Sequence, residues 1–501
     1  MDSCGALAVF LASCFFLASC VVGPKYARPA VETPPAYKEI APPDSATGVS
    51  WKTAQPSDAG LRGNWWEVFQ DPRLNELEEK VATGNQNVAA AAASYAAARA
   101  LVREARSQYF PTLSAIPSVT YSRTSPGQLG AFPGGGSNPS PRPYTNYSLP
   151  AEASWEPDLW GRVRSSVRAN AYAAQASFAD LASVGLAMQA ELAADYYELR
   201  GQDALKEVLD STVVDYRETF DLAQVQYKAG IGSDETVALA EAQLKAAQAQ
   251  DTNLGVLRAQ YEHAIAVLIG QPASTFSLPP DPSPTTEPAI PAGIPGDLLE
   301  RRPDVAAAER AMAQANAQIG VAKSAFFPSV LLSGVAGFGN LSLRDWLTWP
   351  SRFWAVGTSI SQIIFDGGLR KATVQQFRAS YDQTVATYRQ TVLTGFQEVE
   401  DNLATLRILS ETIRQQDEAV QAATRSLAEA TVRYNAGVDP YLNVLVAQTI
   451  LLNDREAAVN FRTQQIVASV QLIKALGGGW DASQMPSPAN VAAGTAGGQH
   501  R

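Results

Sequence analysis

The chain has 501 residues, which is too long for one compact core of ordinary size, so several domains or one elongated architecture are expected. Its formal net charge of −10 argues against a nucleic-acid partner, because phosphate binding requires clustered Lys and Arg. The three cysteines (Cys4, Cys14 and Cys20) all precede residue 21, and only two histidines occur. The remaining chain therefore lacks the residues of a disulfide, a Cys/His metal cluster or a Ser/His or Cys/His catalytic pair. We expect no enzyme, no metal site and no bound cofactor.

The first twenty residues are similar to an export signal. Residues 5–18 are almost wholly apolar and small, and this run is too short to span a membrane as a helix. The sequence Leu17-Ala18-Ser19-Cys20 is similar to a bacterial lipobox, which implies a signal peptide over 1–19 and a covalent lipid on Cys20. Several acyl chains, each gaining about 0.8 kcal/mol per buried CH₂, would give stable anchoring. An ordinary cleaved signal with an incidental cysteine is the alternative.

A two-fold internal repeat organises the mature sequence. Asn87-Val88-Ala89-Ala90 returns as Asp304-Val305-Ala306-Ala307, and Tyr227-Lys228-Ala229-Gly230 returns as Tyr434-Asn435-Ala436-Gly437. A Pro-rich stretch, typical of an extended linker, separates the copies. We therefore expect a lipidated extension over 20–60, repeat 1 over 61–270, a linker over 271–295, repeat 2 over 296–480 and a disordered tail over 481–501.

Each copy predicts the same order of elements: an Ala-rich helix, two strands, a very long helix, a tight Gly turn and a returning helix. In repeat 1 we expect strands at about 111–122 and 145–157, a long helix at about 161–228 and a turn near 230. In repeat 2 the corresponding ranges are 328–340, 352–365 and 369–436, with a turn near 437. A helix of about 68 residues, at 1.5 Å per residue, reaches about 100 Å, which a globular domain cannot house.

The apolar positions of the second long helix are spaced by three and four, and later by sevens at Ile413, Val420, Leu427 and Tyr434. Such spacing predicts a seam that supercoils against neighbouring helices. Alanine crowds the other faces, which permits close helix contacts on several sides, as in a curved wall. On the helices alone, a rod-like bundle without a duct remains the alternative.

The strand segments alternate between apolar and polar residues. Between 147 and 156, the odd positions from Tyr147 to Trp155 are apolar and the even positions are mostly polar, which is typical of a membrane strand with lipid on one side and water on the other. Four strands cannot close a barrel, and open sheet edges in lipid leave backbone groups unsatisfied. Subunits must therefore share one barrel. A barrel of twelve strands, four from each subunit of a trimer, is wide enough to leave a lumen.

Several motifs, spread over nearly all of the mature sequence, resemble the TolC-like outer-membrane efflux channels, and in particular the lipoprotein (NodT-type) branch that serves resistance-nodulation-division (RND) pumps. They are Cys20-Val21-Val22-Gly23-Pro24-Lys25-Tyr26, Trp65-Trp66-Glu67-Val68-Phe69, Asp158-Leu159-Trp160-Gly161-Arg162, Leu299-Glu300-Arg301-Arg302-Pro303-Asp304-Val305, Ala325-Phe326-Phe327-Pro328-Ser329 and Ala475-Leu476-Gly477-Gly478-Gly479-Trp480.

The resemblance implies a mostly α fold with a β-barrel: a homotrimer with a 12-strand barrel in the outer membrane and a 12-helix tunnel through the periplasm. It implies a passive conduit that exports drugs or other small toxic compounds and takes them from a periplasmic adaptor and an inner-membrane RND pump. The expected location is the outer membrane, with a lipid anchor and an extension into the periplasm.

The same resemblance places both Gly turns at the periplasmic tip, where Tyr227, Gly230, Tyr434 and Gly437 would meet the adaptor. Relatives commonly carry an Asp after the second tip glycine, where this chain has Val446. The candidate gate residues are therefore Asn443 and Val446, with Asp439 and Asp234 as alternative sources of acidity.

Two other functions stay open at this point. The first is the outlet of a type I protein secretion system, which has the same architecture and another cargo. The second is a lipid-anchored coiled-coil scaffold without a pore, against which the alternating strands argue.

Overall fold

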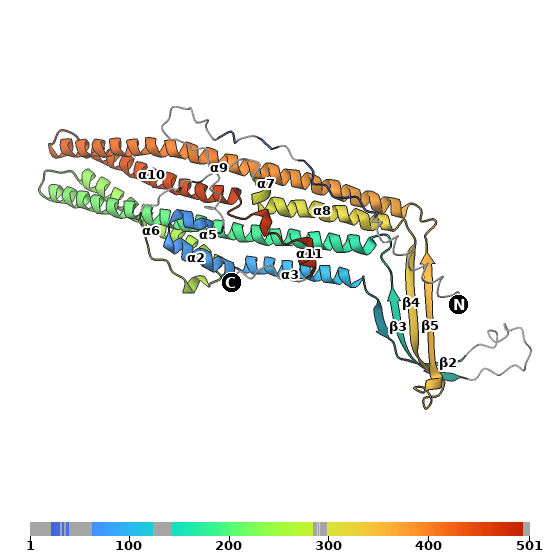
Figure 1. Ribbon diagram of the computed structural model, residues 1–501. Coiled ribbons are helices and arrows are strands. Elements are labelled where there is room, and N and C mark those ends of the chain that lie inside the picture. The colour runs from blue at the N-terminus through green and yellow to red at the C-terminus, as the bar shows by residue number, and fades with distance from the viewer. Residues whose placement is uncertain are drawn as a thin grey trace, which may run out of the picture.

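The computed structural model describes residues 22–30, 33–34, 37–39, 63–123, 143–283, 288, 290 and 298–493. Long helices lie side by side along one axis, and a sheet extends from one end of them (Figure 1). Cys20 and the signal peptide lie outside the described residues.

The helices of the two repeats follow the same order. Repeat 1 holds η2 (Trp65–Phe69), α2 (Pro72–Gly84), α3 (Gln86–Ser107), α5 (Arg162–Lys228) and α6 (Asp234–Leu268), and η3 (Ala273–Thr275) lies in the linker. Repeat 2 holds α7 (Leu298–Arg301), α8 (Pro303–Ser324), η5 (Trp349–Ser351), α9 (Leu369–Asn435) and α10 (Tyr441–Ala475), and η6 (Ala482–Gln484) and α11 (Pro488–Ala493) follow it.

The two long helices, α5 and α9, have 67 residues each, which corresponds to about 100 Å. Each starts after a glycine in the left-handed conformation, Gly161 or Gly368, which turns the chain from the sheet into the helix. The apolar seam of α9 faces inward: Val374, Tyr388 and Val399 are buried. Helix α9 packs against α10 and α8, while α5 packs against α6, α8 and α3.

The sheet is antiparallel and contains β1 (Thr112–Ala115), β2 (Ser118–Ser122), β3 (Tyr144–Trp155), β4 (Ser329–Asn340) and β5 (Arg352–Ser361). Its order is β1-β3-β4-β5, and β2 also pairs with β3. The span predicted as one strand over 111–122 is divided, because Pro117 has no N–H to donate to the ladder. Strands β1 and β2 therefore occupy one position beside β3, and the β3–β4 pair joins the two repeats.

The tail predicted to be disordered over 481–501 is partly folded, so that prediction is wrong for η6 and α11. Val491 is buried against Val102 and Ala174, and the side chain of Gln175 donates to the carbonyl of Pro486 at 2.8 Å. These contacts, which a local sequence pattern does not reveal, hold the segment on α5 and α3.

Candidate functional site

The register of the sheet gives it two chemically different faces. Residues directly opposite in neighbouring strands share a face, and successive residues of a strand alternate between faces. One face is mostly apolar, and its apolar members include Leu113, Val119, Tyr121, Tyr147, Leu149, Trp155, Val330, Leu332, Phe338, Trp354, Val356 and Ile360. The other is mostly polar, with Thr112, Ser114, Thr120, Asn146, Ser148, Glu152, Ser154, Ser333, Ser359 and Ser361.

The apolar face is open to its surroundings. Trp354, Val356 and Ile360 lie together on this face and are 70–81% exposed. A contiguous exposed apolar surface, unlike scattered single apolar residues, indicates a site of interaction. From Tyr147 to Trp155, eight steps of about 3.3 Å give about 26 Å of strand, close to the thickness of a hydrocarbon layer. The face thus has the chemistry and the height of a lipid-facing wall.

Among the described residues, the sheet also has two unpaired edges. Strand β5 pairs with β4 alone, and β1 and β2 pair with β3 alone. Each edge presents a row of backbone N–H and C=O groups that another strand can satisfy.

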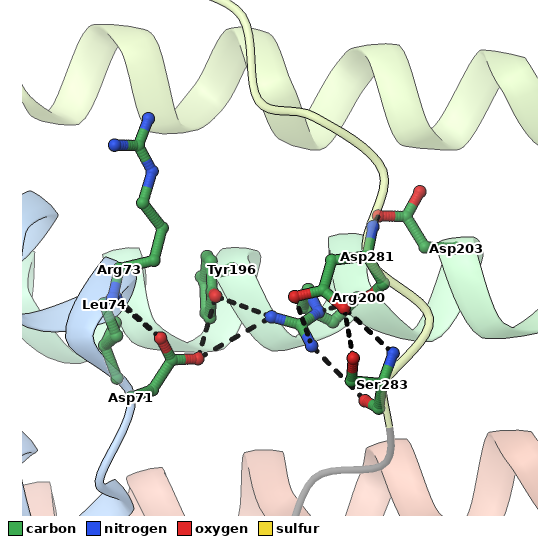
Figure 2. A network of polar contacts seen from close by, with 8 residues as sticks. All are labelled: Asp71, Arg73, Leu74, Tyr196, Arg200, Asp203, Asp281 and Ser283. Carbon is green, nitrogen blue, oxygen red and sulfur yellow. Dashed lines mark hydrogen bonds and ion pairs between the residues drawn. The ribbon is translucent and has the colours of Figure 1, made fainter.

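Midway along the helices, a polar network ties the linker to repeat 1 (Figure 2). The Asp71 carboxylate accepts from the backbone of Arg73 and Leu74 and so caps α2, and it also accepts from the Tyr196 hydroxyl at 2.8 Å. The Arg200 guanidinium donates to that hydroxyl at 2.8 Å and to the carbonyl of Asp281 at 2.6 Å. Burial and the bond to Asp71 raise the pKa of Tyr196.

The linker is held by α6 as well. Arg258 donates to the carbonyl of Leu278 at 2.7 Å, and the backbone N–H of Leu278 donates to Glu262 at 2.6 Å. Leu278 itself is buried in the core that contains Trp65 and Tyr197. The described part of the linker is therefore packed along the helices of repeat 1.

The described N-terminal residues run along α8 and α9. The Tyr26 hydroxyl donates to Glu309 at 2.5 Å, and the backbone of Lys38 donates to Glu400 at 2.7 Å. At the start of this segment the N–H of Val22 donates to the carbonyl of Trp160 at 3.5 Å, where the sheet meets α5. The chain therefore enters the described structure at the sheet end of the helices.

The predicted tip residues lie at the opposite end, in the two turns between long and returning helices (Figure 1). Gly230 and Gly437 have φ of +76° and +74°, the left-handed region that favours glycine, and each N–H donates back to a carbonyl of the long helix. Tyr227 is about half exposed, whereas Tyr434 is turned inward.

Two tyrosines link the hairpin α5–α6 to the hairpin α9–α10. The Tyr434 hydroxyl donates to Gln226 at 2.9 Å, and that of Tyr441 donates to Gln243 at 3.3 Å. The two rings lie 5.5 Å apart, and burial raises the pKa of Tyr441 to about 12. Sequence reasoning missed Tyr441, Gln226 and Gln243. The internal repeat makes Tyr434 the equivalent of Tyr227 but does not reveal that its hydrogen-bond partner is Gln226.

The candidate gate residues lie at or just after the two turns. Asp439 accepts two bonds from Arg433, at 2.7 and 3.0 Å, and this guanidinium lowers the pKa of the carboxyl. Asn443 and Val446 lie on the first turns of α10 with exposed side chains, and Asp234 is exposed at the start of α6. The structure thus brings Asp439 and Asn443 to one turn and leaves Asp234 on the other.

In the part of the chain that the structure describes, no cluster of three or more His, Cys, Asp or Glu has the arrangement of a metal site. No helix within that part combines the length and apolarity needed to cross a membrane.

The sequence pattern of the outer membrane efflux protein family matches residues 78–271 and 294–478. The solvent efflux pump outer membrane protein SrpC of Pseudomonas putida is 33% identical over 421 residues, which are 83% of this chain and 88% of that protein. Outer membrane protein OprJ of Pseudomonas aeruginosa is 31% identical over 472 residues, 93% of this chain and 94% of its own length. Among solved structures, the outer-membrane channel OprN matches with a TM-score of 0.81 at 31% identity, covering 92% of this chain and 100% of that one.

These likenesses confirm the predicted family, the predicted outer-membrane location and the predicted role in efflux rather than catalysis. The chain belongs to the TolC-like family of outer membrane efflux proteins.

Proposed function

We propose that three copies of this chain form one passive conduit, with a shared twelve-strand barrel in the outer membrane and a helical tunnel in the periplasm. The observation that carries the proposal is the sheet: one apolar face, one polar face and two open edges. Each copy supplies four strand positions, so no single copy can satisfy its edges in hydrocarbon. Joining the β5 edge of one copy to the β1–β2 edge of the next closes the ring around the polar face.

Single cysteines on the two faces of β5 test this arrangement. Ser359 lies on the polar face and Val356 on the apolar face. In planar bilayers, a charged thiol reagent should reduce the single-channel conductance of Ser359→Cys trimers and leave that of Val356→Cys unchanged. Purified protein that is monomeric by native mass spectrometry, or trimers that never conduct, would contradict the proposal.

The conduit is one part of a three-part pump. The two hairpin tips, with Tyr227, Gly230, Tyr434 and Gly437, dock a periplasmic adaptor that connects to an inner-membrane RND pump and passes on small toxic compounds. Support comes from relatives named as pump components for solvents. A photoreactive residue at 227 should crosslink to the adaptor, whereas one at 414, an exposed position of α9 away from the tip, should not. Deletion of the gene followed by a susceptibility panel identifies the exported compounds.

The covalent lipid is placed on Cys20. The bond between Val22 and Trp160 supports this placement, because a residue two positions earlier can reach the membrane level at the sheet end of the helices. Palmitate labelling should mark the native chain and not Cys20→Ser, and labelling of both would exclude Cys20 as the lipidated residue.

The closed tip is held by apolar or hydrogen-bonded contacts near Asn443 and Val446. Val446 is about half exposed in a single copy of the chain, so its side chain can contact neighbouring copies at a narrow aperture. Asn443→Ala and Val446→Ala should raise single-channel conductance and alter antibiotic susceptibility. Unchanged values for both variants would remove these residues from the gate.

A further inference from the structure

The loop between β4 and β5, residues 341–351, lies at the end of the sheet away from the helices (Figure 1). Its conformation is fixed by hydrogen bonds. The buried Ser351 hydroxyl donates to the carbonyl of Asp345 at 2.7 Å and accepts from Asn340 at 2.6 Å, and the Trp346 indole donates to the carbonyl of Phe338 at 3.2 Å. We call this segment the outer loop.

The outer loop presents large apolar side chains to its surroundings. Leu341, Leu343, Leu347 and Trp349 are between 61% and 73% exposed. The Trp346 ring lies 5.7 Å from that of Tyr147, so the apolar surface of the loop continues the apolar face of the sheet. A contiguous apolar surface of this kind indicates a lipid or protein partner, and its continuity with the sheet face favours acyl chains.

Two arginines accompany these side chains. Arg352 shares the apolar face with Trp354, and its guanidinium lies 4.0 Å from the centre of the Trp349 ring. Arg344 is exposed on the loop. Residues 341–352 carry two arginines and one acid, Asp345, a net charge of 2 − 1 = +1 in a chain of net charge −10. A guanidinium at the rim of a lipid-facing wall is complementary to a phosphate group, because its positive charge and its fork of N–H donors fit the phosphate oxygens.

We propose that the outer loop is a binding site for a phosphorylated lipid of the outer leaflet of the outer membrane. The acyl chains lie on the apolar sheet face, and the phosphate accepts hydrogen bonds from Arg352 and Arg344. Trp349 holds the Arg352 guanidinium at the level of the head groups, where an indole ring is itself stable. This inference rests on the proposed function, because it requires the sheet to lie in the membrane.

Binding of bisphosphorylated lipid A and of fully dephosphorylated lipid A to detergent-purified trimers, measured by native mass spectrometry, tests the proposal. The native protein should bind the phosphorylated lipid more tightly. Arg352→Gln should weaken binding of the phosphorylated lipid about tenfold, as expected for loss of a charge-assisted contact, and should leave the dephosphorylated lipid unaffected. The matched control Arg414→Gln, on the surface of α9, should bind as the native protein does.

Arg344→Gln repeats the test with a residue outside the sheet. Weaker binding by this variant cannot be attributed to a folding defect of β5, which Arg352→Gln could cause. Inorganic phosphate at millimolar concentration should not displace the lipid, and full displacement would assign the site to free phosphate instead. Equal binding of both lipids by the native protein, or undiminished binding by both variants, would overturn the proposal. Failure of the proposed function is seen separately, as loss of trimers and of conductance in the same preparation.

Discussion

The hydroxyl of Tyr434 donates to Oε1 of Gln226 across 2.9 Å and so joins the two helical hairpins near the tip. The neighbouring bond from Tyr441 to Gln243 spans the same pair of hairpins. Because the two hairpins come from different repeats, a tip that opens by moving one hairpin past the other must break both bonds.

Tyr434→Phe combined with Tyr441→Phe should therefore favour the open tip. Each lost bond removes about 1 kcal/mol from the closed arrangement, and a trimer would lose six bonds. We expect a clear rise in open probability in planar bilayers. Tyr95→Phe, whose ring packs on Phe178 far from the tip, is the matched control. An open probability equal to that of the native channel would show that these bonds do not restrain the tip.

Glycine at the tip turn is required by backbone conformation alone. Gly437 has φ of +74°, and a Cβ atom added there would meet nothing within 4 Å, so the cost of Gly437→Ala is conformational, about 1 kcal/mol. Gly255, inside α6, also has open space around it but stands in a helix. Gly255→Ala should stabilise that helix by about 1 kcal/mol. Amide hydrogen exchange should become faster at the tip in the first variant and slower around 255 in the second. The same direction of change in both would contradict this account.

Asp195 makes stability depend on pH. Burial, with the neighbouring charges of Glu191 and Glu198, raises its pKa to about 6 from an ordinary value of 3.8. The folded state therefore binds the proton more tightly than the unfolded state does, and this group becomes increasingly destabilising as the pH rises from about 4 to about 6. Asp195→Asn should raise the melting temperature at pH 8 and have little effect at pH 4. A gain of equal size at both values would point to packing rather than to ionisation.

The Arg200 guanidinium holds the network of Figure 2 together. Arg200→Leu removes the cation paired with the largely buried Asp71 carboxylate and the donor to the Asp281 carbonyl, and should cost about 3 kcal/mol in the free energy of unfolding. Arg414→Leu removes only exposed ion pairs and should leave the free energy of unfolding almost unchanged. Urea denaturation followed by circular dichroism measures both. Equal costs would show that the network adds nothing beyond a surface pair.

Local patterns were enough to predict much of the fold. The proline-free stretches read as helices at 161–228 and 369–436, and the structure has α5 at Arg162–Lys228 and α9 at Leu369–Asn435. Gly230 and Gly437 could be assigned to turns because glycine adopts the left-handed conformation without strain. The alternation from Tyr147 to Trp155 indicated two unlike faces. Each of these signals depends on residues close together in the chain.

The relationships between residues far apart in the chain could be established only from the tertiary structure. Strand β4 alternates poorly, and only its pairing with β3 and β5 assigns Leu332 and Phe338 to the apolar face. The partner of Tyr434 proved to be Gln226, and the tail expected to be disordered forms α11 because Val491 finds a buried site between α3 and α5. Spacing along the chain sets the period and length of an element, whereas contacts across the chain depend on which surfaces meet. Periodicity therefore determined the long helices and turns of this protein, and packing between its two repeats decided the faces, the links at the tip and the folded part of the tail.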